Sequence, residues 1–354
     1  MGLVIGMDEA GYGPNLGPLV LTATVWEVPD RPKKTDFWKT FAEIAQRDIA
    51  RRDKTPAKQT SSKPTPGKKT TAEETPVDST AVDDRLHIAD SKAVYSPAIG
   101  LGALERGTLA AFGVASRVPS DFDELLDVLG TCGTLASAPI SSDVRGSELW
   151  FSQDAELPLP LSEEGRSAAR AAEKWRSVCE ATGVRLRAIH SDVVAPRRWN
   201  LATRETDNKA TALSQMHLQL LRRVWDPDTD GRTIVFADKH GGRNRYAELL
   251  TESLDGRMVM CRGESRDSSV YRVGSTEIQF EARAERHFPV AVASMVSKYV
   301  RELAMELFNR FWQTHLPTLK PTHGYPRDSH RFRRDVAEVQ SRLAIPDEML
   351  WRER

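Results

Sequence analysis

Apolar residues recur along this chain in two different periods. Residues 2–8 form a short apolar run that predicts a buried strand, and in residues 18–26 apolar side chains alternate with threonines, as in a second strand. The stretch between them is rich in Gly and Pro, which favour turns. We therefore predict that the chain opens with a β-hairpin.

The remainder of the chain alternates helix and strand signals. Helices are predicted at 162–182, 207–225 and 289–312, the last with a wide apolar stripe at helical spacing, and strands are predicted at 184–192 and 233–238. Alternation of strands and helices is typical of an α/β fold. We predict a central mixed β-sheet flanked by helices.

Two segments interrupt this pattern. Residues 53–80 consist mainly of Lys, Thr, Pro, Ser and Glu, and a segment so poor in large apolar residues is predicted to be disordered. Residues 117–160 are rich in loop signals and predict a partly ordered elaboration. We expect a single domain at 1–335, interrupted by both segments and followed by a tail at 336–354.

Composition narrows the function classes. The chain has 50 Lys and Arg against 50 Asp and Glu, so its net charge does not indicate a globally basic nucleic-acid-binding protein. Cys132, Cys179 and Cys261 lie far apart, which fits a reducing compartment. No apolar run approaches the ~20 residues of a membrane helix. We expect a cytoplasmic protein with no membrane association, and no obligate protein partner is indicated.

Two aspartates, Asp8 and Asp238, end short apolar runs shortly before glycines. The carboxyl ends of strands in an α/β sheet place side chains in one crevice. Adjacent strand residues point to opposite faces, so Glu9 shares this crevice with Asp8 only if the chain turns immediately. Carboxylates gathered there repel one another unless a hard cation such as Mg²⁺ or Mn²⁺ binds. The alternatives are a solvated acidic turn and the cap of a dinucleotide-binding loop, but the glycine spacing and Pro18 oppose that cap.

Five motifs follow one another in the order found in the type 2 ribonuclease H family, ribonucleases HII and HIII. They are DEAGYGPNLGP at 8–18, DSK at 90–92, the strand end FAD at 236–238, RAERHFPVAVASMVSKYVREL at 283–303 and THGYPRDSH at 322–330. The chain resembles this family over most of its length outside 27–80 and 117–160.

The resemblance implies an RNase H-like fold with a C-terminal helical extension. It also implies a metal-dependent endoribonuclease that cuts the RNA strand of RNA/DNA hybrids, or cuts at ribonucleotides embedded in duplex DNA, and leaves 3′-hydroxyl ends. The implied catalytic residues, which are also the implied ligands of two Mg²⁺ or Mn²⁺ ions, are Asp8, Glu9, Asp238 and Glu285. The implied substrate contacts are Gly11, Tyr12, Gly13, Ser91, Lys92 and Tyr325.

Three positions depart from the family pattern. Tyr12 stands where ribonuclease HII members carry Arg between two glycines, and Arg327 stands in place of a threonine. The fourth acid is Glu rather than Asp and lies one residue closer to Ser294 than expected, so Glu281 and Glu302 remain alternatives to Glu285. Two other functions stay open: a DNA-directed nuclease on the same superfamily fold, and a non-catalytic nucleic-acid-binding relative.

Overall fold

A computed structural model describes residues 1–29, 31–47, 83–131, 148–151 and 156–353. The insertion predicted at 53–80 and Cys132 lie outside these residues. Within them, no helix combines the length and the apolar composition that a membrane crossing requires.

Seven strands in the described part of the chain form one large sheet in the order β5-β2-β1-β6-β9-β8-β7. Their bounds are β1 Gly2–Ala10, β2 Leu19–Val28, β5 Arg185–Val194, β6 Arg232–Asp238, β7 Met260–Glu264, β8 Ser268–Val273 and β9 Thr276–Glu281. β1 is antiparallel to β2 and parallel to β6, and β6 is parallel to β9. The predicted class, an α/β fold with a central mixed sheet flanked by helices, is confirmed.

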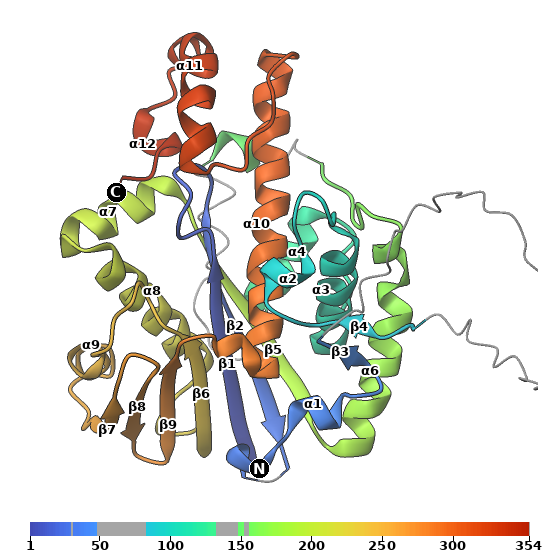
Figure 1. Ribbon diagram of the computed structural model, residues 1–354, viewed down its shortest axis with the longest axis vertical. Helices are drawn as coiled ribbons and strands as arrows, with labels where there is room; N and C mark the ends of the chain where they lie inside the picture. The colour runs from blue at the N-terminus through green and yellow to red at the C-terminus, as the bar shows by residue number, and fades with distance from the viewer. Residues whose placement is uncertain (30, 48–82, 132–147, 152–155, 354) are drawn as a thin grey trace, which may run out of the picture.

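Helices cover both faces of this sheet (Figure 1). They are α1 Phe37–Thr40, α2 Ser91–Val94, α3 Gly102–Ala115, α4 Phe122–Thr131, α6 Ala168–Thr182, α7 Pro196–Thr206, α8 Lys209–Val224, α9 Ala247–Ser253, α10 Phe288–His315, α11 Pro326–Arg342 and α12 Asp347–Leu350. Short 3-10 helices are η1 Pro32–Lys34, η2 Leu149–Phe151, η3 Glu164–Ser167 and η4 Ala284–Arg286. A small second sheet pairs β3 Ala45–Gln46 with β4 Leu86–His87.

The core has two parts, one on each face of the sheet. Val4 and Trp26 face the part that includes α10, α3 and α6, whereas Ile5 and Leu21 face the part that includes α8. Because both faces of β1 and β2 are covered, these strands are apolar on both sides. The hairpin at the start of the chain is therefore the centre of the fold.

The first turn of α10 lies directly on β1. A Cβ on Gly6 would stand 2.2 Å from the carbonyl carbon of Pro289, so only glycine permits this approach. The hydroxyl of Thr24 donates to the carbonyl oxygen of Pro289 at 2.8 Å, which satisfies an acceptor buried at the contact. The long apolar helix is thereby held against the strand that carries Asp8.

The predicted opening hairpin, the strands at 184–192 and 233–238, and the three predicted helices are all present, with ends shifted by a few residues. Strands β7, β8 and β9 are not among the predicted elements. β7 is exposed along its whole length, so it has no apolar pattern to detect. The buried alternation in β8 and β9 around Gly274 was a detectable hairpin signal.

The loop-rich segment at 117–160 contains α4, whose Leu125 and Leu129 are buried in the core, so its described part is ordered. At the other end, α11 crosses the predicted boundary between 335 and 336. Leu350 and Arg352 are also buried, so this region packs as part of the main unit.

Candidate active site

Asp8 and Asp238 come from neighbouring parallel strands. β1 and β6 pair in register up to Met7 and Ala237, so the next residue of each strand is an aspartate at the same edge of the sheet. Asp8 is 6% exposed, and Asp238 is partly buried. Parallel pairing therefore brings together two acids that are 230 positions apart in the sequence.

Glu285 joins them through the short helix η4, which follows β9. The carboxylate of Asp238 accepts a hydrogen bond from the backbone N–H of Ala284 at 3.3 Å, and this bond ties η4 to the end of β6. Burial, and then the charge of Asp238, raise the pKa of Glu285 above its ordinary value. Glu285 thus shares the electrostatic surroundings of the two aspartates.

The two alternative acids are engaged elsewhere. Glu281 accepts from Arg286 at 2.6 Å and lies 2.7 Å from Nε2 of His287. Glu302 accepts from Lys298 at 2.6 Å and from the hydroxyl of Tyr95 at 2.7 Å. Despite burial, His287 and Arg286 lower the pKa of Glu281. Burial likewise opposes the shift of Glu302, but His323, then Lys298 and Tyr95, lower its pKa to about 2. Glu285 has no such hydrogen bond or ion pair with a basic side chain in the part of the chain that the structure describes.

From the sequence, Glu9 was expected to share a crevice with Asp8 only if the chain turned directly after Asp8. β1 continues to Ala10, so the chain does not turn after Asp8, and Glu9 faces α8 on the other side of the sheet. Its Oε2 lies 3.5 Å from Nε2 of His217. Even so, its charge interacts with Asp238 and Glu285, because it stands at the end of the strand.

The four acids disfavour one another's ionised forms. Burial, and then neighbouring negative charge, raise the pKa of Asp8 well above its ordinary value and that of Glu9 to about 8. Burial is also the main cause of the raised pKa of Asp238. Burial lowers the pKa of Lys92, but the charge of Asp90 and then those of Asp8, Glu285 and Asp238 outweigh it and raise this pKa. The cluster is therefore strongly negative when ionised, with one lysine beside it.

A hard divalent cation suits this cluster by its donor chemistry, since all the facing groups are carboxylate oxygens. A bound cation would also favour the ionised forms of the four acids, which burial and, for Asp8, Glu9 and Glu285, neighbouring negative charge disfavour. As the side chains stand, however, no group of three or more Asp, Glu, His or Cys in the described part of the chain surrounds a single point. The fit therefore rests on chemistry and charge.

The Asp-Ser-Lys motif reaches the cluster from one side. Asp90 caps α2 by accepting from the N–H of Lys92 at 3.0 Å. Ser91 is bonded to Ser294 of α10, whose hydroxyl also bonds the carboxylate of Asp8. Capping and these serine bonds hold Lys92 beside the acids.

The Gly-Tyr-Gly loop lies beyond the end of β1. Gly11 has φ +96°, and a Cβ there would meet Arg301 at 2.6 Å, so the position requires glycine. The ring of Tyr12 packs edge-on against Trp199 of α7, with ring centroids 6.0 Å apart. Gly13 is exposed. Neither Tyr12 nor Gly13 has an acceptor for its backbone N–H among the described residues.

The last motif adjoins this loop. The backbone N–H groups of Asn15 and Leu16 both donate to the carbonyl oxygen of Gly324, at 2.8 and 3.3 Å. Tyr325, at the start of α11, is 50% exposed, so its ring is open to a ligand. The first and last motifs, from distant parts of the sequence, are therefore hydrogen-bonded to each other.

No protein-family model matches the chain, and none of the curated proteins compared with it matches. Several solved structures do. RNase HII of Archaeoglobus fulgidus, from a structure of the PCNA:RNase HII complex, is 14% identical, with a TM-score of 0.40 and coverage of 99% of this chain and 94% of that one. Ribonuclease H2 of Pyrococcus horikoshii OT3 is 14% identical, with a TM-score of 0.42 and coverage of 98% and 92%. Bst-RNase HIII, in complex with Mn²⁺, is 13% identical, with a TM-score of 0.40 and coverage of 99% and 66%.

The chain resembles ribonucleases HII and HIII. TM-scores this low do not support a functional conclusion. A functional conclusion for this chain depends on the residues of the site.

Two buried histidines behind Glu9 escaped the sequence analysis. The rings of His217 and His240 stack with centroids 4.1 Å apart, and Nδ1 of His240 is 3.0 Å from the hydroxyl of Ser214. Burial lowers the pKa of His217 to about 4, so the pair is neutral near pH 7. The detectable signal was the place of His217, four residues after Leu213 on the apolar face of its helix.

Arg301 and Arg352 are also buried near the Gly-Tyr-Gly loop, at 1% and 4% exposure. Arginine is rarely buried to this extent. Arg301 donates to the carbonyl oxygens of Leu16 and His323 at 3.3 and 3.0 Å. Nothing in the local sequence distinguished either residue from an exposed arginine.

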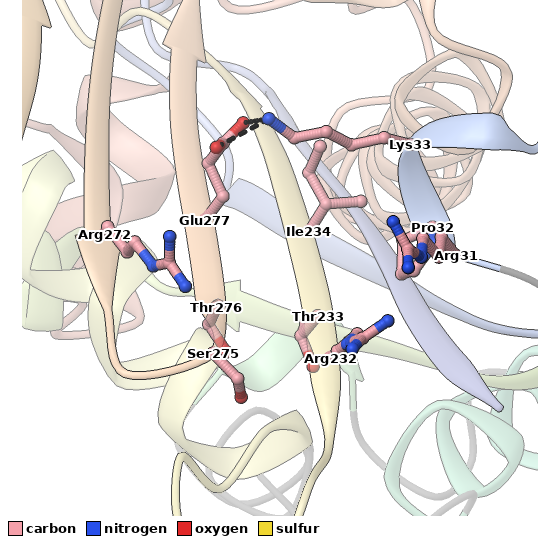
Figure 2. A pocket seen from close by; sticks show the side chains of 10 residues that line it. All are labelled: Arg31, Pro32, Lys33, Arg232, Thr233, Ile234, Arg272, Ser275, Thr276 and Glu277. Carbon is pink, nitrogen blue, oxygen red and sulfur yellow. Dashed lines mark hydrogen bonds and ion pairs between the residues drawn. The ribbon is translucent and has the colours of Figure 1, made fainter.

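A separate cavity of about 360 Å³ opens at the other end of the sheet, where β6 begins. Figure 2 shows Arg31, Arg232 and Arg272 around it, together with the ion pair between Lys33 and Glu277 at 2.7 Å. Arg232 and Asp238 are the first and last residues of β6, which places this cavity roughly 20 Å from the acids. It is not part of the candidate active site.

Proposed function

We propose that this protein is a metal-dependent endoribonuclease of the type 2 ribonuclease H kind. It hydrolyses the RNA strand of RNA/DNA hybrids, or cuts at ribonucleotides embedded in duplex DNA, and leaves 3′-hydroxyl ends. The observation that carries the proposal is the set of four mutually repelling carboxylates, Asp8, Glu9, Asp238 and Glu285, at one edge of the sheet. The order of the five sequence motifs supports it independently.

Asp8, Glu9, Asp238 and Glu285 would hold Mg²⁺ or Mn²⁺, and the chemistry that such an ion would supply there is activation of a water and stabilisation of the leaving oxygen. Lys92 provides a positive point charge for a phosphate next to the cleaved bond. The backbone N–H groups of Tyr12 and Gly13, which have no acceptor among the described residues, donate to the substrate at the ribose, where the 2′-hydroxyl distinguishes RNA from DNA. Tyr325 offers an exposed ring on which a sugar or base packs.

A cleavage assay on three matched duplexes tests the proposal: an RNA/DNA hybrid, a DNA duplex with one ribonucleotide, and an all-DNA duplex. Each is incubated with Mg²⁺, Mn²⁺ or a chelator. We expect cleavage of the hybrid, of the single-ribonucleotide duplex or of both, and no cleavage in chelator. Cleavage of the all-DNA duplex alone, or binding of hybrid without cleavage in either ion, would contradict the proposal.

Variants at the acids test the assignment of the site. Asp8→Asn and Glu285→Gln should lower the cleavage rate by at least about 100-fold. Glu281→Gln is the matched control for the fourth acid, since Glu281 is bonded to Arg286 and His287, and it should retain most of the activity. Full activity in Asp8→Asn would refute the metal-binding role of the cluster, and loss in Glu281→Gln with activity in Glu285→Gln would reverse the assignment.

A further inference from the structure

The loop between β1 and β2 is bonded to residues 351–353, which we call the 351–353 segment. Trp351 forms an antiparallel bridge with Leu16, and the N–H of Arg352 donates to the carbonyl oxygen of Asn15 at 2.9 Å. The guanidinium of Arg352 also donates, through Nη2, to the carbonyl oxygens of Gly11 and Pro14. A single side chain thus bonds to the backbone on either side of Tyr12 and Gly13.

The 351–353 segment is itself anchored on α7. The side-chain amide of Asn200, which is 2% exposed, donates to the carbonyl oxygen of Trp351 and accepts from the N–H of Glu353, both at 2.7 Å. The carboxylate of Glu353 is paired with Arg204. Because Tyr12 packs on Trp199 of the same helix, α7 supports both the loop and the segment that bonds to it.

Arg352 is an unusual choice for a purely structural contact. It is 4% exposed, has no carboxylate partner among the described residues, and leaves Nε and Nη1 without acceptors. Burial, and then the nearby charge of Arg301, lower its pKa to about 9. A buried cation of this kind is unfavourable for stability, and retaining one is consistent with a need for one particular backbone conformation.

The bond to Gly11 has a geometric consequence for the next residue. In a planar trans peptide the carbonyl and the N–H point in opposite directions. A guanidinium bonded to the carbonyl oxygen of Gly11 therefore directs the N–H of Tyr12 away from Arg352, and this N–H has no acceptor among the described residues. Without Arg352, no side chain among the described residues donates to the carbonyl of Gly11, and the glycine at this position permits the Gly11–Tyr12 peptide to take other orientations.

We propose that Arg352 is a positioning residue that fixes the Gly11–Gly13 backbone in the orientation that recognises a ribose at the cleaved position. The proposal rests on the proposed function. Arg352 is distant from this loop in the sequence. By fixing the loop, Arg352 makes it selective for ribose in a chain that carries Tyr12 where ribonucleases HII have arginine. Arg352 acts through the loop and does not touch the substrate.

Three variants of the protein test this role. Arg352→Met removes all donors at similar volume, and Arg352→Lys keeps the charge on a side chain that is one bond shorter and lacks the Nη2 atom that donates to both carbonyls. Arg204→Gln is the control, because Arg204 pairs with the same segment without touching the loop. The readouts are kcat/KM for single-ribonucleotide and all-DNA duplexes, Mn²⁺ affinity by calorimetry, and hydrogen–deuterium exchange of residues 10–17.

We expect Arg352→Met and Arg352→Lys to lower the ribose-over-deoxyribose ratio of kcat/KM by about tenfold or more and to speed exchange in residues 10–17. Mn²⁺ affinity should stay within about twofold of the wild-type value, because the acids are not touched. Arg204→Gln should behave as wild type. If Arg352→Met does not fold, the same measurements on Arg352→Lys decide.

The outcomes separate the two proposals. If the wild type cleaves with ribose selectivity and the Arg352 variants keep the same ribose-over-deoxyribose ratio of kcat/KM, the role of Arg352 is refuted. The proposed function is not affected by that result. Wild-type behaviour of Arg352→Lys with loss in Arg352→Met would assign the effect to charge and overturn the two-carbonyl mechanism. A wild-type protein that cleaves no ribonucleotide-containing duplex overturns the proposed function and this inference with it.

Discussion

Replacing Glu9 with glutamine should remove a pH-dependent penalty from the folded protein. The carboxyl of Glu9 has a pKa of about 8 in the folded chain against an ordinary 4.5, because burial and then the charge of Asp238 disfavour its ionised form. In the unfolded chain the same group ionises near its ordinary value. A glutamine at position 9 has nearly the same shape and does not ionise.

The sign and size of the effect follow from proton binding. Between about pH 4.5 and pH 8 the folded chain holds a proton on Glu9 that the unfolded chain has lost, so the free energy of unfolding falls as the pH rises. The slope is about 1.4 kcal/mol per pH unit, which gives an upper limit of about 5 kcal/mol across the window. Glu9→Gln should therefore gain stability over wild type as the pH rises, and the gain should level off above pH 8.

Urea unfolding of both proteins in chelator, at about pH 5.5, 7 and 8.5, measures this difference. Glu173→Gln is the control, because Glu173 is exposed on α6, and it should show no pH-dependent difference from wild type. A stability difference between Glu9→Gln and wild type that stays constant over this range would refute the argument that Glu9 is buried in a field of negative charge.

Four further changes test other parts of the structure. Gly6→Ala should destabilise by at least about 1–3 kcal/mol in urea unfolding, since its Cβ would stand 2.2 Å from the backbone of Pro289; a neutral result would contradict the close approach of α10. Trp26→Ala should lose about 3–5 kcal/mol in the same assay, because Trp26 is fully buried; a loss below about 1 kcal/mol would mean that its site is not packed as described. Glu302 has a pKa of about 2 in the folded protein, so its stabilising contribution to the free energy of unfolding is complete above about pH 4.5 and is lost as the pH falls towards 2. Glu302→Gln should therefore lose less stability than wild type between pH 4.5 and pH 2, and an equal loss would contradict the ion pairs of Glu302. Mn²⁺ should raise the Tm of wild type near pH 8 and leave that of Asp238→Asn nearly unchanged, with equal shifts in both proteins counting against a metal at this cluster.

Local signals determined the elements at the centre of the fold. The opening hairpin, β6 and α10 were predictable because each carries its own apolar period, and the acids at the ends of β1 and β6 were visible because each follows an apolar run. β7 was not predictable in the same way, because it is exposed along its length and has no apolar face. A strand of that kind is defined by its hydrogen-bonded neighbour rather than by its own side chains.

The order of the motifs indicated the chemistry but could not choose the fourth acid. The sequence does not distinguish Glu281, Glu285 and Glu302, because all three are glutamates near the start of the same helix or within it. They differ in the side chains that the fold places beside them. Glu281 and Glu302 are paired with basic side chains, while Glu285 shares the negative surroundings of Asp238. Which carboxylate is free to bind a cation is a property of the tertiary structure.

The sequence alone thus determined that strands end in acids and that a glycine-rich turn follows the first of them. The tertiary structure decided that Glu9 faces His217 across the sheet from α10, and that Arg352 bonds to the carbonyl of Gly11 from 341 positions away. Secondary structure follows from neighbours a few residues apart, whereas burial and charge pairing depend on contacts between distant segments. For this reason the acids that follow apolar runs could be found in the sequence, and the distant residues that contact them and the glycine-rich loop could not.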